Sequence, residues 1–167
     1  MIDMQTATQH PDIEALLEKV TDPEIPVLSI MDMGVVRPIE KQENGLLVNI
    51  TPSYSGCPAM DTIAMDIKVT LEQAGYPTKV KLILAPAWTT DWITPRGRAR
   101  LEEYGIAAPL EANADKNALL DGARIVPCTR CGSTNTKMIS QFGSTACKAL
   151  FQCEDCLEPF DYFKCLK

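Results

Sequence analysis

Four cysteines near the C-terminus are the residues best suited to chemistry, because they form two Cys-x-x-Cys pairs. Cys128 and Cys131 make the first pair, Cys153 and Cys156 make the second, and 21 residues separate the pairs. Two residues between thiols let both sulfurs converge from one tight turn, which we call a knuckle. Two knuckles supply four thiolates, a closed set that suits a structural Zn²⁺ ion. The spacing therefore predicts a zinc site.

Two other chemistries are open to this arrangement. Four thiolates also hold iron or an iron–sulfur cluster, and one Cys-x-x-Cys pair can carry out thiol redox reactions. Two pairs in one short segment favour a single shared metal over separate redox sites. A segment of about forty residues also buries too little apolar surface to fold without a metal or another cross-link.

Three cysteines lie outside these pairs. Cys57, in Gly56-Cys57-Pro58, is predicted at the N-cap of a helix, with Pro58 in the first position, and the N-terminal N–H groups and dipole of that helix would favour a thiolate. Carboxylates at Asp22 and Glu24 would suit a transient metal site at that thiol. The alternative for Cys57 is a small buried hydrophobic residue. Cys147 and Cys165 are interpreted as buried or incidental thiols, with entry of Cys147 into the metal shell as the alternative.

A proline-broken segment holds both tryptophans of the chain, Trp88 and Trp92. Arg96 and Arg98 follow on a predicted helix. Aromatic and arginine side chains are enriched at partner surfaces, so these four residues form a candidate docking surface. The alternatives are core packing for the tryptophans and a solvated helix face for the arginines. His10 is the single histidine, which disfavours a Cys–His pair or a Ser-His-Asp triad and hence hydrolase chemistry.

Apolar periodicity and turn residues predict the elements that must position these side chains. The stretch 27–36 is predicted as an apolar loop or short strand. Helices are expected over 12–20, 59–74 and 95–104, and strands over 35–42, 46–51, 79–84, 134–139 and 148–152. The fold class is therefore α+β. A small mixed domain over 1–106 is followed by a linker over 107–123 and by a zinc ribbon of short β-hairpins over 124–167.

The charge of the chain divides in the same way. The 167 residues carry a net charge of −6, with −8 in residues 1–123 and +2 in residues 124–167. An acidic chain is poorly suited to the phosphate backbone, so we expect no nucleic-acid partner. No apolar run is long enough to span a membrane, and the first ten residues lack the basic start of a secretory signal. Together with the odd number of cysteines, this predicts a cytoplasmic protein.

Two motifs in the N-terminal part resemble the SufT-like iron–sulfur assembly family: Asp22-Pro23-Glu24 and the loop that carries Cys57. Nearly the whole chain is similar to the PaaD family (the PaaJ subunit) of bacterial phenylacetate degradation. The matching segments are DPEIPVLSIMDMG, TPSYSGCPAMD, APAWTTDWITPRGRARLEEYGI, FGSTACKALFQC and CLEPFDYFKC. The pairing of this domain with a four-cysteine ribbon makes the resemblance specific.

The resemblance implies an accessory factor rather than an enzyme. It would help to mature the metal centre of the phenylacetyl-CoA ring epoxygenase, with the [2Fe–2S] reductase component as recipient. Cys57 would contact an iron–sulfur cluster or iron transiently, supported by Asp22 and Glu24, while the ribbon cysteines hold structural zinc. The implied partners are the epoxygenase components and the general iron–sulfur assembly machinery, and a homodimer is also considered. The alternative is a structural or regulatory subunit of the oxygenase complex.

Overall fold

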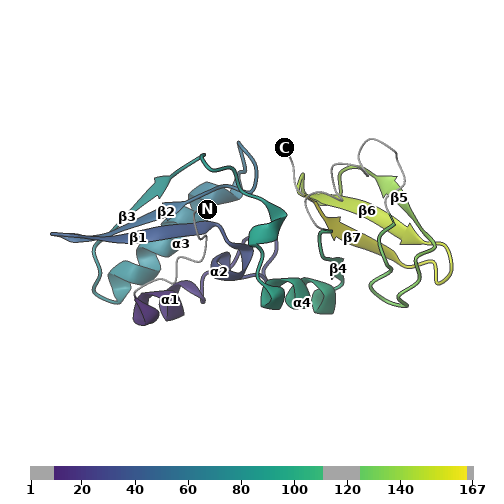
Figure 1. Cartoon of the computed structure of the whole chain (residues 1–167), viewed down its shortest axis with the longest axis horizontal. Helices are drawn as coiled ribbons and strands as arrows, with labels where there is room; N and C mark the ends of the chain where they lie inside the picture. The colour runs from purple at the N-terminus through teal and green to yellow at the C-terminus, as the bar shows by residue number, and fades with distance from the viewer. Residues whose placement is uncertain (1–9, 111–124, 165–167) are drawn as a thin grey trace, which may run out of the picture. The chain divides into compact units, whose positions relative to one another are not determined.

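The computed structural model describes residues 10–110 and 125–164, and the chain divides into two compact units. The first unit is Met1–Trp88 and the second is Thr89–Lys167. Each unit contains its own β-sheet together with helical segments (Figure 1). The predicted mixture of helix and sheet is thereby confirmed.

The first unit is built around a three-stranded sheet in the order β1-β2-β3. Its elements are α1 (Pro11–Leu17), α2 (Ile30–Met33), β1 (Val36–Gln42), β2 (Gly45–Ile50), α3 (Ala59–Gln73) and β3 (Thr78–Leu82). β1 and β2 form an antiparallel hairpin, whereas β3 runs parallel to β2. Parallel neighbours require a crossover connection, which α3 provides. The predicted hairpin, helix and third strand are all present.

Helix α3 shows why the sequence folds in this way. Its buried residues Ile63, Ile67 and Leu71 recur at intervals of four and form one apolar face. The hairpin depends on Gly45, whose φ is +143° and where an added Cβ would lie 2.0 Å from the carbonyl oxygen of Pro77. A side chain at this turn would therefore clash with the backbone.

The stretch predicted as an apolar loop or short strand contains the one-turn helix α2. The Ser29 hydroxyl oxygen accepts a hydrogen bond from the Asp32 N–H at 3.0 Å, which caps the start of this helix. Gly34 ends it in the left-handed conformation with φ +73°. The cap and the glycine are visible in the sequence, but four residues are too few to show a helical period.

The second unit contains a four-stranded sheet in the order β4-β7-β6-β5. Its elements are η1 (Thr90–Trp92), α4 (Pro95–Tyr104), β4 (Ile106–Ala107), β5 (Thr136–Ser140), β6 (Lys148–Cys153) and β7 (Pro159–Phe163). Strand β6 is antiparallel to both β5 and β7, and β4 is parallel to β7. The predicted α4, β5 and β6 are present, whereas β7 was not predicted.

The boundary between the units differs from the predicted one, because residues placed before the ribbon pair with it. Ile106, assigned to the first domain, lies opposite Asp161 of β7. Ala107 belongs to the same buried cluster as Tyr162, and the Leu110 N–H donates a hydrogen bond to the Tyr162 hydroxyl at 3.2 Å. The division therefore falls after Trp88 rather than at residue 106. Residues 111–124, most of the predicted linker, lie outside the described residues.

Candidate functional site

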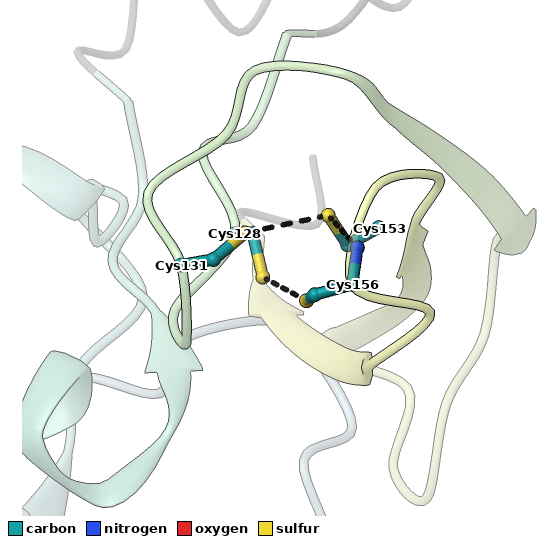
Figure 2. A group of neighbouring side chains, drawn as sticks. All are labelled: Cys128, Cys131, Cys153 and Cys156. Carbon is teal, nitrogen blue, oxygen red and sulfur yellow. Dashed lines mark hydrogen bonds between the residues drawn. The ribbon is translucent and has the colours of Figure 1, made fainter.

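The two knuckles of the ribbon bring their four sulfur atoms together. One ligand atom from each of Cys128, Cys131, Cys153 and Cys156 lies within 4.8 Å of all the others. The Sγ atoms of Cys128 and Cys156 are 3.7 Å apart, and those of Cys131 and Cys153 are 3.6 Å apart (Figure 2). Tetrahedral zinc with Zn–S bonds of about 2.3 Å needs sulfur separations of about 3.8 Å. The four thiols therefore fit one tetrahedral metal ion.

Backbone N–H groups point at the sulfurs and prepare them for a metal. The Arg130 N–H donates to Cys128 Sγ at 3.4 Å, and the Cys156 N–H donates to Cys153 Sγ at 3.5 Å. Burial opposes ionisation of Cys128, but hydrogen bonds from the N–H groups of Cys131 and Arg130 lower its pKa to about 7. The first thiolate of the set is thus accessible near neutral pH.

Cys156 shows the opposite behaviour. The Glu158 N–H favours its thiolate, yet burial and the three neighbouring thiols raise the pKa of Cys156 to about 12. Four adjacent sulfurs cannot all carry negative charge without a cation between them. A metal cation bound between the sulfurs would allow all four cysteines to ionise.

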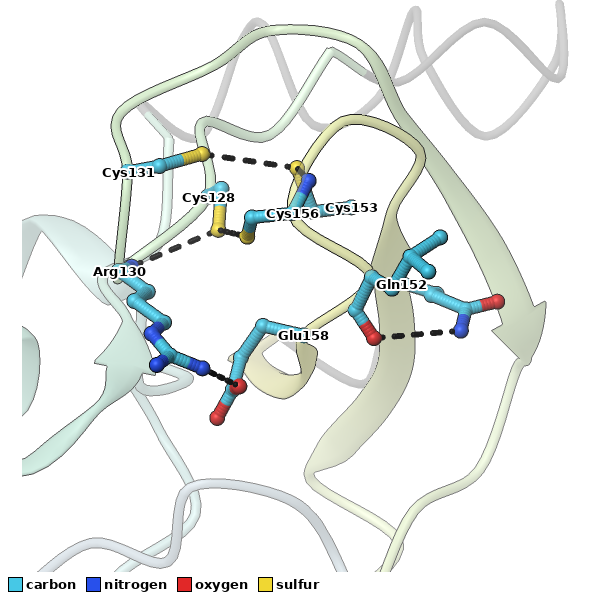
Figure 3. Close-up of polar contacts among 8 residues, drawn as sticks. Cys128, Arg130, Cys131, Gln152, Cys153, Cys156 and Glu158 are labelled. Carbon is cyan, nitrogen blue, oxygen red and sulfur yellow. Dashed lines mark hydrogen bonds and ion pairs between the residues drawn. The ribbon is translucent and has the colours of Figure 1, made fainter.

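Polar contacts tie the two knuckles to one another outside the sulfur set. Arg130 and Glu158 form an ion pair with an N–O distance of 2.6 Å (Figure 3). The Asp155 carboxylate accepts hydrogen bonds from the Ser133 hydroxyl at 2.5 Å and from the Asn135 side-chain amide at 2.7 Å. These polar contacts were not predicted from the sequence. The sequence indicates them only through the polar side chains within and beside both knuckles.

Cys57 lies in the loop that leads into α3 and is half-buried. Its N–H donates to the Tyr54 carbonyl at 3.2 Å, and its carbonyl accepts from the Met60 N–H at 3.3 Å. The helix starts at Ala59 with Pro58 as the N-cap residue, so Cys57 lies one position before the cap, whereas the sequence predicted it at the cap. The N–H of Ala59 nevertheless reaches the sulfur, as a helix N-terminus was expected to do.

The electrostatic surroundings of Cys57 oppose its ionisation, contrary to the expectation of a favoured thiolate. Burial raises the pKa of Cys57 above its ordinary value, and the negative charges of Glu24 and Asp22 raise it further. Hydrogen bonds from the Ala59 N–H and the Ser53 side chain act in the other direction but do not compensate. The structure thus brings both predicted carboxylates within electrostatic reach of the thiol, and it adds Ser53, which sequence reasoning missed.

The predicted docking surface is not available at its first residue. Trp88 is buried, with 3 % of its surface exposed, and its indole N–H donates to the Met33 carbonyl at 2.9 Å. Trp92 is half-buried in η1. Arg98 in α4 donates to the carbonyl oxygens of Pro109 at 2.5 Å and Thr90 at 2.7 Å. Trp88 and Arg98 therefore have internal roles, while Arg96 is exposed.

Cys147 and Cys165 are the two cysteines outside both candidate sites. Cys147 is a buried thiol whose Sγ lies 3.1 Å from the Thr145 hydroxyl, and it is not part of the four-cysteine group. Cys165 lies outside the described residues.

Across residues 10–110 and 125–164, none of the helices has the length and apolar character needed to cross a bilayer.

Two family models match the chain, one on each side of the unit boundary. The iron–sulfur cluster assembly protein family matches residues 11–82, which include Asp22, Glu24 and Cys57. The PaaD zinc beta ribbon domain matches residues 112–164, which include the four knuckle cysteines. The first model therefore covers the candidate site at Cys57, and the second covers the four-cysteine site.

Individual relatives agree with these matches. A protein of Escherichia coli (strain K12), named as one of the subunits of 1,2-phenylacetyl-CoA epoxidase, is 50 % identical over 159 residues, covering 95 % of this chain and 94 % of that protein. An Fe-S protein maturation auxiliary factor of Porphyromonas gingivalis is 30 % identical over 54 % of this chain and 88 % of its own length.

A solved structure also resembles part of the chain. The DUF59 domain from Bacillus anthracis has a TM-score of 0.50 and 26 % identity, over 53 % of this chain and 87 % of that one. The chain belongs to the PaaD family, in which an iron–sulfur cluster assembly domain is joined to a four-cysteine zinc ribbon.

Proposed function

We propose that this protein is an accessory factor that helps to assemble an iron–sulfur cluster, or to deliver iron, for a phenylacetyl-CoA epoxidase system. The reductase component, which we expect to carry a [2Fe–2S] cluster, is the proposed recipient. The name of the E. coli relative supports the pathway, and the P. gingivalis relative supports the maturation role. An accessory role is preferred over catalysis of ring oxidation, because no general base or phosphate-binding loop is evident in the sequence.

The observation that carries this proposal is the set of groups around Cys57. A half-buried thiol lies within electrostatic reach of the carboxylates of Glu24 and Asp22. Two negative charges beside a thiol are unfavourable for a bare thiolate but favourable for a bound cation. Iron or a cluster arriving as cargo would replace the thiol proton of Cys57, and the carboxylates would stabilise its positive charge.

The ribbon has a separate, structural role in this proposal. We infer that Cys128, Cys131, Cys153 and Cys156 hold zinc, whose chemistry here is to cross-link the two knuckles. The sulfur separations of 3.6 and 3.7 Å and the match to a zinc ribbon family support this inference. The small core of the ribbon then gains stability from the metal.

The alternative function, a purely structural or regulatory subunit of the epoxidase, rested on a docking surface around the two tryptophans. Burial of Trp88 and its hydrogen bond to Met33 remove one of the two tryptophans from that surface. A docking role elsewhere on the molecule is compatible with the maturation proposal.

The test is the substitution Cys57→Ser in a strain that produces the reductase. We expect the variant to keep its fold and its zinc, because Cys57 is outside the zinc set, while the reductase accumulates with less of its [2Fe–2S] cluster. Iron content and visible absorption of the purified reductase measure the effect. Cys147→Ala is the matched control, because Cys147 belongs neither to the four-cysteine group nor to the site around Cys57. Full cluster content with Cys57→Ser would refute the proposal.

A further inference from the structure

The residue that follows the second cysteine of each knuckle has a left-handed backbone conformation. In the first knuckle this residue is Gly132, with φ +72°, and in the second it is Leu157, with φ +63°. Residues with a Cβ atom rarely adopt this conformation, because Cβ crowds the following carbonyl oxygen. Among the residues that the structure describes, Leu157 is the single non-glycine residue with a positive φ.

The fold of the second knuckle holds Leu157 in this conformation. The Gln152 side-chain amide donates to the Leu157 carbonyl at 3.4 Å (Figure 3). The Cys153 N–H donates to the Glu158 carbonyl at 2.9 Å. The first knuckle meets the same requirement with a glycine, where an added Cβ would have no atom within 4 Å. The knuckle geometry thus requires a left-handed residue but does not require a leucine.

The leucine side chain does not compensate for this cost within the chain. Leu157 is 67 % exposed and is absent from the buried cluster of the ribbon. The left-handed backbone of Leu157 costs stability, and the exposed side chain, which is hydrated in the unfolded chain as well, recovers none of that cost by burial. A strained residue whose side chain is not buried in its own chain is a candidate for contact with another molecule.

The charges around Leu157 indicate the chemistry of that molecule. Glu154 and Asp155 are exposed on the same knuckle, and Glu158 follows Leu157 directly. Arg130 pairs with Glu158 at 2.6 Å and Lys137 pairs with Glu154 at 2.5 Å. Zinc held by the four thiolates would add two further negative charges to the single net negative charge of these side chains. The knuckle is therefore negative overall, which favours a partner with a positive surface.

We propose that Leu157 is the apolar anchor with which the ribbon docks into a protein partner, in an apolar pocket rimmed by Lys and Arg side chains. An apolar centre surrounded by charged groups is the usual anatomy of a protein interface. The negative rim speeds association and opposes wrong partners, while burial of the leucine side chain supplies affinity.

The probe for this proposal is the purified reductase component, a choice that rests on the proposed function. Calorimetric titration of the full-length, zinc-loaded chain measures its Kd for the reductase. Leu157→Gly is expected to raise that Kd about tenfold, with unchanged zinc content and an unchanged or higher unfolding midpoint. Leu157→Asn should behave alike, because asparagine tolerates the left-handed conformation. Higher salt should weaken the wild-type complex.

Met138→Ala is the matched control, because Met138 in β5 is an apolar side chain of the same unit that is 53 % exposed. Its Kd should equal that of the wild type. Wild-type affinity in Leu157→Gly, or no binding of the reductase by the wild type, would overturn the proposal. Sedimentation velocity adds a third arm: a wild-type dimer that Leu157→Gly dissociates would assign the pocket to a second copy and overturn the chosen partner.

Failure of this proposal is distinguishable from failure of the function proposed for Cys57. If Leu157→Gly binds normally while Cys57→Ser still lowers the cluster content of the reductase, only the docking inference is refuted. If Cys57→Ser leaves the cluster content unchanged while Leu157→Gly weakens binding, docking is supported and the maturation role is refuted.

Discussion

The carboxylates of Asp22 and Glu24 lie two residues apart in sequence but contribute differently to the site. Asp22 is 3 % exposed, and its Oδ1 accepts hydrogen bonds from the N–H groups of Glu24 at 2.7 Å and Ile25 at 3.0 Å. These bonds fix the turn that carries Glu24. Glu24 is half-buried and lies within electrostatic reach of Cys57. Asp22 thus shapes the loop, and Glu24 adds the larger of the two charge effects on the thiol.

The substitution Glu24→Gln should make Cys57 more reactive. Removing one negative charge lowers the pKa of Cys57 toward its ordinary value, so the thiolate fraction at pH 8 increases. Iodoacetamide should then alkylate Cys57 several-fold faster than in the wild type, as followed by mass spectrometry of the peptide that contains it. In both proteins the rate should rise with pH, since only the thiolate reacts.

Glu72→Gln in α3 is the control for this experiment, because Glu72 pairs with Lys68 and does not act on the pKa of Cys57. Its alkylation rate should match that of the wild type. Equal rates in Glu24→Gln and the wild type would show that Glu24 does not govern the thiol.

Sequence reasoning succeeded for residues whose partners are close in the chain. Cys-x-x-Cys spacing fixes the convergence of two sulfurs locally, so the four zinc-type ligands could be predicted. Trp88 could not be placed in this way, since its hydrogen-bond partner Met33 is 55 residues distant. Ser53 escaped notice for a related reason: a serine in a loop becomes significant only when the fold orients it toward Cys57.

At the scale of elements, the ends of α3 and α4 were predicted closely, whereas α1 ends at Leu17 rather than at residue 20 and the short strand pairings were not predicted. Thr94 caps α4 by accepting from the Gly97 N–H at 3.0 Å, and Gly105 ends it with φ +95°. Such signals lie within a few residues of each other and can be found in the sequence. The two-residue strand β4 has no period of its own and exists only through its pairing with β7.

The knuckles allow a direct measurement of the cost of a left-handed side chain. Gly132→Ala places a Cβ in open space at φ +72°, so its effect is conformational rather than steric. We expect the variant to lower the free energy of unfolding of the ribbon by about 1 kcal/mol. Chemical denaturation of the zinc-loaded protein, followed by intrinsic fluorescence and by zinc release, measures this change.

Gly75→Ala is the matched control, because Gly75 also has positive φ (+90°) and open space around its Cβ but lies in the first unit. It should destabilise the first unit and leave the zinc release of the ribbon unchanged. Equal stability of Gly132→Ala and the wild type would mean that the knuckle tolerates side chains freely, which would also weaken the strain argument for Leu157.

The whole molecule consists of two units with different sources of stability. The first buries an apolar face of α3 together with its own three-stranded sheet. The second has a buried cluster around Phe151 and Tyr162, which includes the knuckle cysteines Cys128 and Cys153. A core that contains metal ligands depends on the metal for its packing.

Removal of the metal should therefore affect the two units unequally. The purified protein is expected to hold about one zinc ion per chain, and a chelator should unfold the ribbon while the first unit remains folded. Hydrogen exchange measured by mass spectrometry should show lost protection in β5, β6 and β7, and in β4 at the same time, because β4 pairs with β7. Strands β1 to β3 and helix α3 should keep their protection.

Metal analysis provides the check on this expectation. Iron in place of zinc would refute the metal assignment. Continued protection of β4 after chelation would show that β4 belongs energetically to the first unit, as the boundary predicted from sequence implied.

The parallel pairing of β4 with β7 also has a consequence for truncation and aggregation. A fragment that begins at residue 124 would lack β4 and leave the outer backbone of β7 unpaired, although Phe160 and Tyr162 on that strand are buried in the intact unit. Exposed strand edges of this kind associate with one another. A fragment that contains the ribbon should therefore begin at Thr89. In the intact unit, the short strand β4 covers part of the edge of β7 and so prevents edge-to-edge association of two sheets.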